Sequence, residues 1–295
     1  MNLLNAILQG IFLGGLYALF ACGLSLIFGV MRIINLAHGD LAVLGAFLVW
    51  TLSTQAGLSP FWALVPALPA MLVVGYLLHR TVLARSLRGG ALTPLLTTFG
   101  LAIVIQNALL EGYSPDVRSL GGAAGGIATG SWRITDQLSV SYLGVLILAV
   151  AVLVLGGLQL ALRRTAFGRE MRATAQDADT AALVGVPAQS VYARATAIAV
   201  ATATLAGVFL AIRSTFDASS GPTQLIFAFE AVVIGGLGSL WGTLWGGMVL
   251  GVAQTIGATI DPQYSILAGH LVFLIVLASP RGRSLFSYRR EGRTA

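Results

Sequence analysis

A charge-dense segment interrupts an otherwise apolar chain between Gly168 and Gly185, with the sequence GREMRATAQDADTAALVG. Only 9% of the 295 residues are charged, so this concentration is unusual. Its charged residues are Arg169, Glu170, Arg172, Asp177 and Asp179. Charges of both signs among small alanines can hold a partner surface in register and allow close approach. The segment is therefore expected to meet something other than lipid.

The same segment is predicted to form one helix that stops at Gly185, before Pro187. At 3.6 residues per turn it has an apolar stripe and a polar stripe, which indicates an amphipathic helix at the cytoplasmic membrane surface. The apolar stripe consists of Met171, Ala175, Ala178 and Ala182, and the polar stripe of Arg169, Arg172, Gln176 and Asp179. Two interpretations remain open, because the helix could dock a partner protein or merely join two spans.

A second polar block, INLAHGDL, contains Asn35, His38 and Asp40. Asn35 is predicted to cap a helix that starts at Leu36. His38 and Asp40 are costly against lipid, so they should face the bundle interior, an interface or water. The block could fix a helix break as a buried polar cluster, or it could form a wall of a solute path near a helix end. Glu230, the only acid between 225 and 260, is a further candidate for that path or a simple interfacial residue.

Several chemistries are excluded by residue content. All 17 basic residues are arginines, so the chain has neither the lysine of a GxxxxGK[ST] phosphate loop nor one for a Schiff base. Cys22 is the only cysteine, and the three histidines lack ligand spacing, so no metal site and no cofactor are expected. An intramembrane serine protease using Ser25 would need a GxSG-type turn, which is absent.

Composition predicts an all-α polytopic membrane protein. Hydrophobic residues make up 57% of the chain and the mean hydropathy is +0.87. We expect a single transmembrane domain over 1–295, with about seven long helices and a glycine-rich hairpin of two short or re-entrant helices within 225–260. Glycines 238, 242, 246, 247 and 251 in this hairpin have the small-xxx-small spacing of closely packed helices. The expected long spans are 3–30, 41–52, 61–78, 92–110, 142–162, 191–212 and 267–277.

The arginines predict the orientation. All but Arg118, Arg133 and Arg213 fall in segments on one side of these spans, including 79–90, 163–172 and the tail from 281. The positive-inside rule makes that side cytoplasmic. The N-terminus and the loop 111–139 are then outside and the C-terminus is cytoplasmic. The net charge of +6 is explained by this topology, and no nucleic-acid partner is expected.

Three blocks together resemble a known family. The chain is similar, in three blocks, to the LivH-type permease subunits of bacterial branched-chain amino-acid ABC importers. In chain order the blocks are GLYALFACGLSLIFGVMRIINLAHGDLAVLGAF, GREMRATAQDADTAALVGV and FEAVVIGGLGSLWGTLWGGMVLG, and they occur in the order that the family has. The resemblance extends over essentially the whole chain. It implies a multi-pass inner-membrane protein that works with two ABC ATPase subunits, a second LivM-like permease and a periplasmic solute-binding protein.

The resemblance also implies a role for the charge-dense segment. Residues 165–187 would be a cytoplasmic coupling helix that sits in a groove of an ATPase subunit. The residues that would carry this coupling are Gly168, Arg169, Glu170, Arg172, Gln176 and Asp177. A secondary-active transporter or channel is the alternative, and the solute could be urea or a short amide instead of an amino acid. The sequence leaves open a homodimer, although the family suggests a heterodimer.

Overall fold

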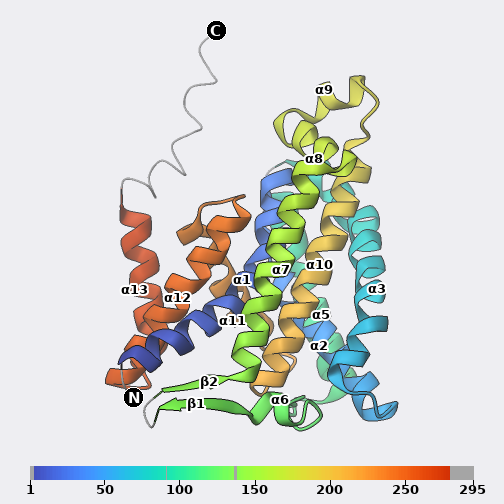
Figure 1. The fold of residues 1–295 in the computed structure, drawn as a ribbon. Coiled ribbons are helices and arrows are strands. Elements are labelled where there is room, and N and C mark those ends of the chain that lie inside the picture. Colours follow the sequence, from blue (N-terminus) through green and yellow to red (C-terminus); the bar gives the residue numbers. More distant parts are fainter. Residues whose placement is uncertain (1–2, 91, 136–137, 280–295) are drawn as a thin grey trace.

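The computed structural model describes residues 3–90, 92–135 and 138–279. It is a helical bundle in which long helices run between two ends (Figure 1). The long helices are α1 Leu3–Met31, α2 His38–Gln55, α3 Pro60–Leu78, α5 Thr93–Tyr113, α7 Tyr142–Arg164, α10 Ala188–Arg213, α11 Gly221–Gly235, α12 Leu240–Ile260 and α13 Tyr264–Ala278. Between α7 and α10 lie α8 Ala166–Gln176 and α9 Ala178–Leu183. These two short helices gather at one end of the bundle, opposite the strands β1 Ser131–Thr135 and β2 Leu138–Ser141 (Figure 1).

The all-α polytopic class is confirmed. Within the described residues, six helical segments are long and apolar enough to cross a membrane: α1, 60–89, α5, α7, α10 and α12. The sixth of them, α12, was expected only as half of a short hairpin. Two expected spans, α2 and α13, fall outside this group, since α2 carries polar residues at both ends and α13 has only 15 residues.

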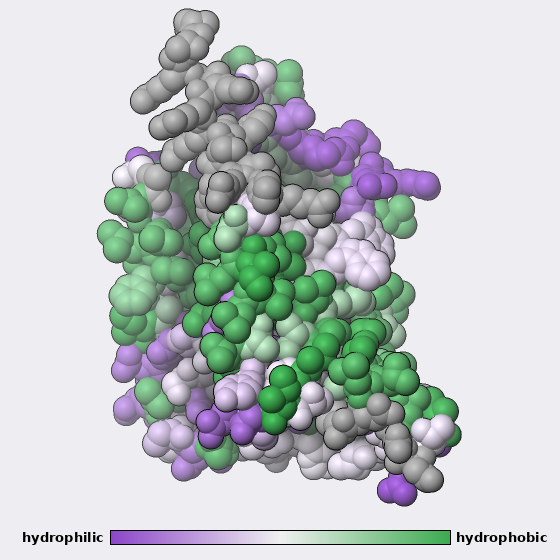
Figure 2. All heavy atoms as spheres, turned by 90° about the vertical axis from the view of Figure 1, so that its left-hand side faces the viewer, coloured by the Kyte–Doolittle hydropathy of each residue, from purple (hydrophilic) through white to green (hydrophobic). Residues whose placement is uncertain are grey.

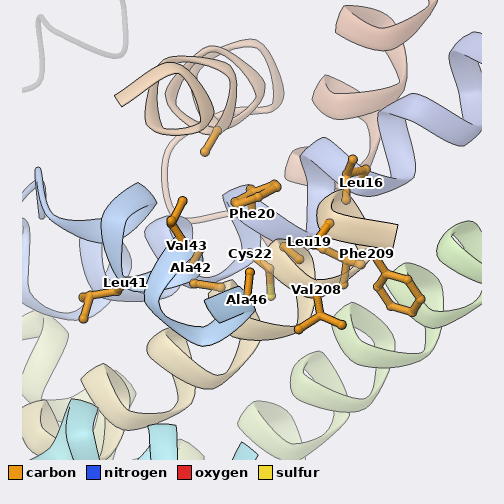
Figure 3. Close-up of a cluster of buried hydrophobic side chains, with 14 of the residues drawn as sticks. Leu16, Leu19, Phe20, Cys22, Leu41, Ala42, Val43, Ala46, Val208 and Phe209 are labelled. Carbon is orange, nitrogen blue, oxygen red and sulfur yellow. The ribbon is translucent and has the colours of Figure 1, made fainter. Parts of the chain in front are cut away.

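The centre of the bundle is formed by α1, α10 and the helices around them. Leu16, Leu19 and Phe20 of α1 pack against α2 and against Val208 and Phe209 of α10 (Figure 3). Each of these five side chains is at most 2% exposed. Because α1 and α10 are buried on nearly all sides, their apolar residues show no one-sided pattern, as expected for a helix surrounded by protein.

The predicted hairpin is present as α11 and α12, and its glycines lie at helix contacts, but α12, with 21 residues, is not a short helix. A Cβ on Gly242 or Gly246 would lie within 2.1 Å of a backbone oxygen of α11, and one on Gly247 or Gly251 would lie within 2.5 Å of one in α1. The two glycine pairs therefore bring α12 into backbone contact with two different helices. Gly238 stands in the connecting turn with φ +81°, a conformation that side chains disfavour.

Three connecting segments differ from the sequence expectation. The expected loop 79–90 is largely helical, since α3 continues into a π-helical turn His79–Leu83, then α4 Ala84–Ser86 and a 3₁₀ turn Leu87–Gly89. The expected external loop 111–139 includes the last turn of α5, a short helix α6 Gly126–Thr129 and most of the β1–β2 hairpin. Local helix and hairpin hydrogen bonds satisfy backbone groups that a loop would leave open. The arginine-rich tail from Arg281 lies outside the described residues.

Large apolar side chains remain exposed along the outer helices. In Figure 2 they gather across the middle of the face that carries α12 and α13. On the outer helices as a whole, exposed examples are Trp245 of α12 at 66%, Leu274 of α13 at 53% and, on a different side of the bundle, Val104 of α5 at 64%. Such faces suit lipid or another membrane subunit.

Candidate functional site

The charge-dense segment is anchored to the C-terminal end of α1 and the N-terminal end of α10. Met171 of α8 is only 1% exposed and belongs to a small apolar cluster of its own. The other buried members are Leu26, Ile27, Val30 and Met31 of α1 and Val191, Ala195 and Ala199 of α10. A buried side chain surrounded in this way holds α8 against the bundle. Movement of α8 would therefore reach α1 and α10 directly.

The backbones of α7 and α8 are in close contact at Gly168. Thr165 caps α8, because its hydroxyl accepts a hydrogen bond from the Gly168 amide at 3.1 Å. A Cβ on Gly168 would lie 2.0 Å from the Leu162 carbonyl oxygen of α7. Arg172 donates a hydrogen bond to the same carbonyl. Gly168 and Arg172 thus fix α8 to the end of α7.

Glu170 has a partner within the chain. Arg194 of α10 donates to its carboxylate at 2.6 Å, and the Arg194 guanidinium stacks over the Phe167 ring at 4.9 Å. Both members of this ion pair are about one-third exposed, at 32% for Glu170 and 39% for Arg194. Glu170 therefore positions α8 on α10, whereas Arg169, Arg172 and Gln176 are exposed. Arg194 was missed by the sequence analysis, which had no means to pair residues 24 positions apart.

The prediction of one continuous helix up to Gly185 is wrong. The helix breaks at Asp177, whose extended backbone ends α8 and whose carboxylate caps α9 through the amides of Asp179 and Thr180, each at 3.0 Å. An aspartate that can bond these amides competes with helix continuation. Hydrogen bonds from the Thr180 hydroxyl and amide lower the pKa of Asp177. The Asp177 carboxylate therefore stays charged through the pH range in which aspartates usually titrate, and the cap is lost only at more acidic pH.

The break also changes which residues are buried. In α9 the buried residue is Ala181, whereas Ala182 of the predicted apolar stripe is exposed. The predicted stop at Gly185 is confirmed, with φ +83° and hydrogen bonds from the Gly185 amide to Ala182 and from the Val186 amide to Ala181.

The tip of α9 exposes two apolar residues that the sequence analysis did not single out. Leu183 is 87% exposed and Val184 is 75% exposed. The helix α9, which ends at Leu183, lies at the far end of the bundle in Figure 1. Apolar side chains directly before the Gly185 stop were the available signal. Next to the exposed charges of α8 they complete a surface with a polar part and an apolar part, as protein interfaces have.

The second polar block forms a turn that folds back beside α1. His38 Nε2 lies 2.9 Å from the carbonyl oxygen of Phe20, about 16 Å from the end of α1 at 1.5 Å per residue. The helix α2 therefore begins inside the bundle. It starts at His38 and not at Leu36 as predicted, since the Asn35 side-chain oxygen accepts from the Ala37 amide at 3.1 Å and holds a turn before the helix. The Leu36 amide donates to the Thr98 hydroxyl of α5 at 3.1 Å.

Asn35, His38 and Asp40 form a cluster in sequence around the start of α2, and all three are buried, with exposures of 0%, 0% and 1%. Their side chains have different neighbours, since His38 contacts α1 whereas Asp40 contacts α5 and α11. Each keeps a buried polar atom without a hydrogen-bond partner: Asn35 Nδ2, His38 Nδ1 and Asp40 Oδ2. The other Asp40 oxygen accepts from Gln106 of α5 at 2.9 Å. An unpaired buried polar group destabilises the fold by about 1–3 kcal/mol. A ligand that bonds these atoms would therefore remove part of that cost.

The N-terminus of α11 meets this cluster. A Cβ on Gly39 would lie 2.0 Å from the Gly221 carbonyl oxygen, and one on Gly221 would lie 2.1 Å from Asp40 Oδ1. Two helix N-termini thus converge within the bundle, where free backbone N–H groups and the positive ends of the helix dipoles favour an anionic group. Asp40, in the first turn of α2, lies at this point of convergence.

Glu230, the fourth predicted path residue, does not join the cluster. It lies nine residues beyond Gly221 on α11, about 13 Å along the helix. Its carboxylate pairs with His270 of α13 and is 4% exposed. The three histidines lie apart. His38 of α2 contacts the Phe20 carbonyl of α1, His79 lies beside Gln189 and Thr196 of α10, and His270 of α13 contacts Glu230 of α11.

Comparison with known proteins identifies the family of the chain. Residues 6–279 match the family described as branched-chain amino acid transport system / permease component. The chain belongs to this family. It is 32% identical over 291 residues to the permease protein BraD of the high-affinity branched-chain amino acid transport system of Pseudomonas aeruginosa. The matched region covers 95% of this chain and 94% of that relative. This chain is therefore a multi-pass membrane permease and a transport subunit of the ABC-importer class.

Two further proteins are similar to the permease. The LivH permease protein of the corresponding system of Escherichia coli K12 is 29% identical over 296 residues, covering 95% of this chain and 94% of the relative. A solved structure titled PsaBC from Streptococcus pneumoniae in complex with Fab matches at a TM-score of 0.48 and 16% identity, over 97% of this chain and 95% of the other.

Proposed function

We propose that the permease translocates branched-chain amino acids across the inner membrane, driven by ATP hydrolysed on two partner ATPase subunits. The names of the BraD and LivH relatives, each similar over 95% of this chain, support the solute class. The N-terminus is outside and the C-terminus is cytoplasmic, so α8 and α9 face the cytoplasm. A periplasmic binding protein delivers the solute, and a second, LivM-like permease packs against the exposed apolar helices.

One observation carries the coupling role of 165–187. α8 is fixed on one side to α1, α7 and α10 through Met171, Gly168 and the Glu170–Arg194 pair. Its other side, with the tip of α9, exposes charges and the apolar Leu183 and Val184. A segment that is rigidly joined to the spans and open outward can transmit the closure of an ATPase pair to them. Arg169, Gln176, Leu183 and Val184 are the proposed docking residues, whereas Gly168, Glu170, Arg172 and Asp177 position them.

The path residues are Asn35, His38 and Asp40. Their unpaired polar atoms gain partners if the solute passes the meeting point of α2 and α11, where its carboxylate can meet the helix N-termini and its ammonium group can meet Asp40. They are buried here, so the path is closed at this level in the present conformation. Glu230 is proposed to tie α11 to α13 instead of lining the path.

Reversing the Glu170–Arg194 pair tests the coupling role. Glu170→Arg places two cations together, and their repulsion weakens the contact between α8 and α10 by roughly 1 kcal/mol. ATP-driven uptake should therefore fall about five- to tenfold. The charge-swapped double variant Glu170→Arg/Arg194→Glu should recover most of the uptake. Arg169→Glu, which has no such partner among the described residues, should lose uptake without rescue by Arg194→Glu.

The measurement is uptake into proteoliposomes with co-purified ATPase quantified in parallel. Equal uptake in the wild type and Glu170→Arg would remove the positioning role. Solute uptake by the permease alone, without ATPase subunits, would favour the alternative of a secondary-active transporter or channel. Substitution of urea or a short amide for leucine in the same assay separates the solute alternatives.

A further inference from the structure

A cavity of about 350 Å³ lies between the bundle and α8. Ser25 and Leu26 of α1 form one wall, Gln159 and Arg163 of α7 a second, and Met171 and Arg172 of α8 a third. Gly238 and Leu240, at the turn before α12, close it. Its size is within the range of small-molecule sites, about 300–1,000 Å³. It is separate from the proposed solute path, because Asn35, His38 and Asp40 do not line it.

The charge of the cavity selects an anion. Arg163 and Arg172 both line it, and no aspartate or glutamate does. Arg163 has no ion-pair partner within the described parts of the chain, so its charge is not neutralised by another residue there. A guanidinium on a partly enclosed wall favours a carboxylate or phosphate oxygen through charge-assisted hydrogen bonds.

Ser25 supplies an independent sign of a missing partner. Its hydroxyl oxygen is buried, with the residue 1% exposed, and makes no hydrogen bond within the structure. Serine hydroxyls in helices commonly bond the carbonyl one turn back, as Thr202 and Thr204 do in α10. Ser25 lines the cavity, but its oxygen is screened from the open space in this conformation, so a change of its χ1 rotamer is needed to turn the hydroxyl toward an occupant.

The remaining walls are apolar. Leu26 and Val30 of α1, Met171 and Ala175 of α8 and Leu240 of α12 face the same space. Apolar surface of this kind gains about 25 cal/mol for each Å² that an aliphatic group covers. The matching ligand therefore has a short aliphatic body and one anionic group. A zwitterion fits less well, because its ammonium group would find no carboxylate.

We propose that this cavity is a binding site for a small aliphatic monocarboxylate that enters from the cytoplasmic end of the permease. Its carboxylate bonds Arg163, Arg172 and Ser25, and its chain lies against Leu26 and Met171. The same chemistry, an anionic group on an apolar chain, could be presented by an anionic lipid. The site does not depend on the proposed function, although an occupant would touch both α1 and α8 and so brace the proposed coupling segment.

Binding of 4-methylpentanoate to the full-length permease in phosphatidylcholine nanodiscs tests the site. The carboxylate should bind about tenfold more tightly than its neutral isostere 4-methylpentanamide, and more tightly than the zwitterion L-leucine. Arg163→Gln should weaken binding of the carboxylate about tenfold. Arg164→Gln is the matched control, since Arg164 is the adjacent exposed arginine and does not line the cavity. Ser25→Leu should abolish binding by filling the space. Ser25→Ala is the second variant, to be used where Ser25→Leu does not fold, and it should weaken binding severalfold.

The lipid source is examined by adding phosphatidylglycerol to the nanodiscs. Competition in the wild type but not in Arg163→Gln would assign the anion to a lipid headgroup, and absence of competition would assign it to a soluble carboxylate; both support the anion site. Equal binding of acid and amide, equal losses in Arg163→Gln and Arg164→Gln, or no saturable binding would overturn the proposal. Uptake and ATP hydrolysis do not enter this assay, so its failure is distinct from failure of the proposed function.

Discussion

Replacing Gly168 with alanine is expected to reduce ATP-driven uptake at least tenfold while the permease still inserts in the membrane. The added Cβ would stand 2.0 Å from the Leu162 carbonyl oxygen, a backbone atom that cannot rotate away. The strain of such overpacking is about 1–3 kcal/mol and is relieved by tilting α8 away from α7. That tilt also breaks the Arg172 bond to the same carbonyl. Uptake in proteoliposomes, normalised to inserted protein, measures the effect.

Gly157→Ala is the matched control for this prediction. Gly157 is a glycine of α7 with no atom within 4 Å of an added Cβ, so uptake should stay within twofold of the wild type. If Gly168→Ala transports as well as Gly157→Ala, the junction of α7 and α8 does not set the position of the coupling segment.

Replacing Gly221 with alanine should reduce uptake by a similar factor through a different step. Its Cβ would lie 2.1 Å from Asp40 Oδ1 and 2.8 Å from the Asp40 amide, forcing the N-termini of α2 and α11 apart. The proposed path is deformed while α8 and α9 are untouched. Co-purification of the ATPase should therefore be unchanged, which separates this variant from Gly168→Ala.

Two comparisons bound that expectation. Gly112→Ala, near the end of α5 with open space around it, should behave as the wild type. Asp40→Asn keeps the shape and the Gln106 contact but removes the charge, and should also lower uptake severalfold. Normal uptake by both Gly221→Ala and Asp40→Asn would reduce the Asn35–His38–Asp40 cluster to a structural break.

The sequence predicted those features that follow from local spacing. The glycines at 242, 246, 247 and 251 indicated backbone contact between helices, and the structure places them against α11 and α1. Gly185 and Pro187 predicted the end of the polar segment correctly. In both cases the residue type acts through its own conformation or size, so the neighbours need not be known.

Features set by distant residues could not be predicted. The ion pair of Glu170 depends on Arg194 of another helix. The start of α2 at His38, two residues later than predicted, depends on the His38 contact with Phe20 and the Thr98 contact with Leu36. The break at Asp177 was missed for a local reason, since its carboxylate can cap a new helix as well as end one. The helical continuation at 79–90 was also missed, because its three arginines end the apolar run and hydropathy alone then indicates a loop.

The most direct test of the coupling role is cross-linking from the tip of α9. Cys22 is buried and is the only cysteine, so Cys22→Ala provides a background for a single introduced thiol. Leu183→Cys in this background, reacted with a short thiol-reactive cross-linker in native membranes, should form one major adduct with an ATPase subunit. Gly112→Cys, at the opposite end of the bundle, should form none. A cross-link from Gly112→Cys but not from Leu183→Cys, or Leu183→Cys that reacts freely without any ATPase adduct, would contradict the assignment of 165–187 as the coupling segment.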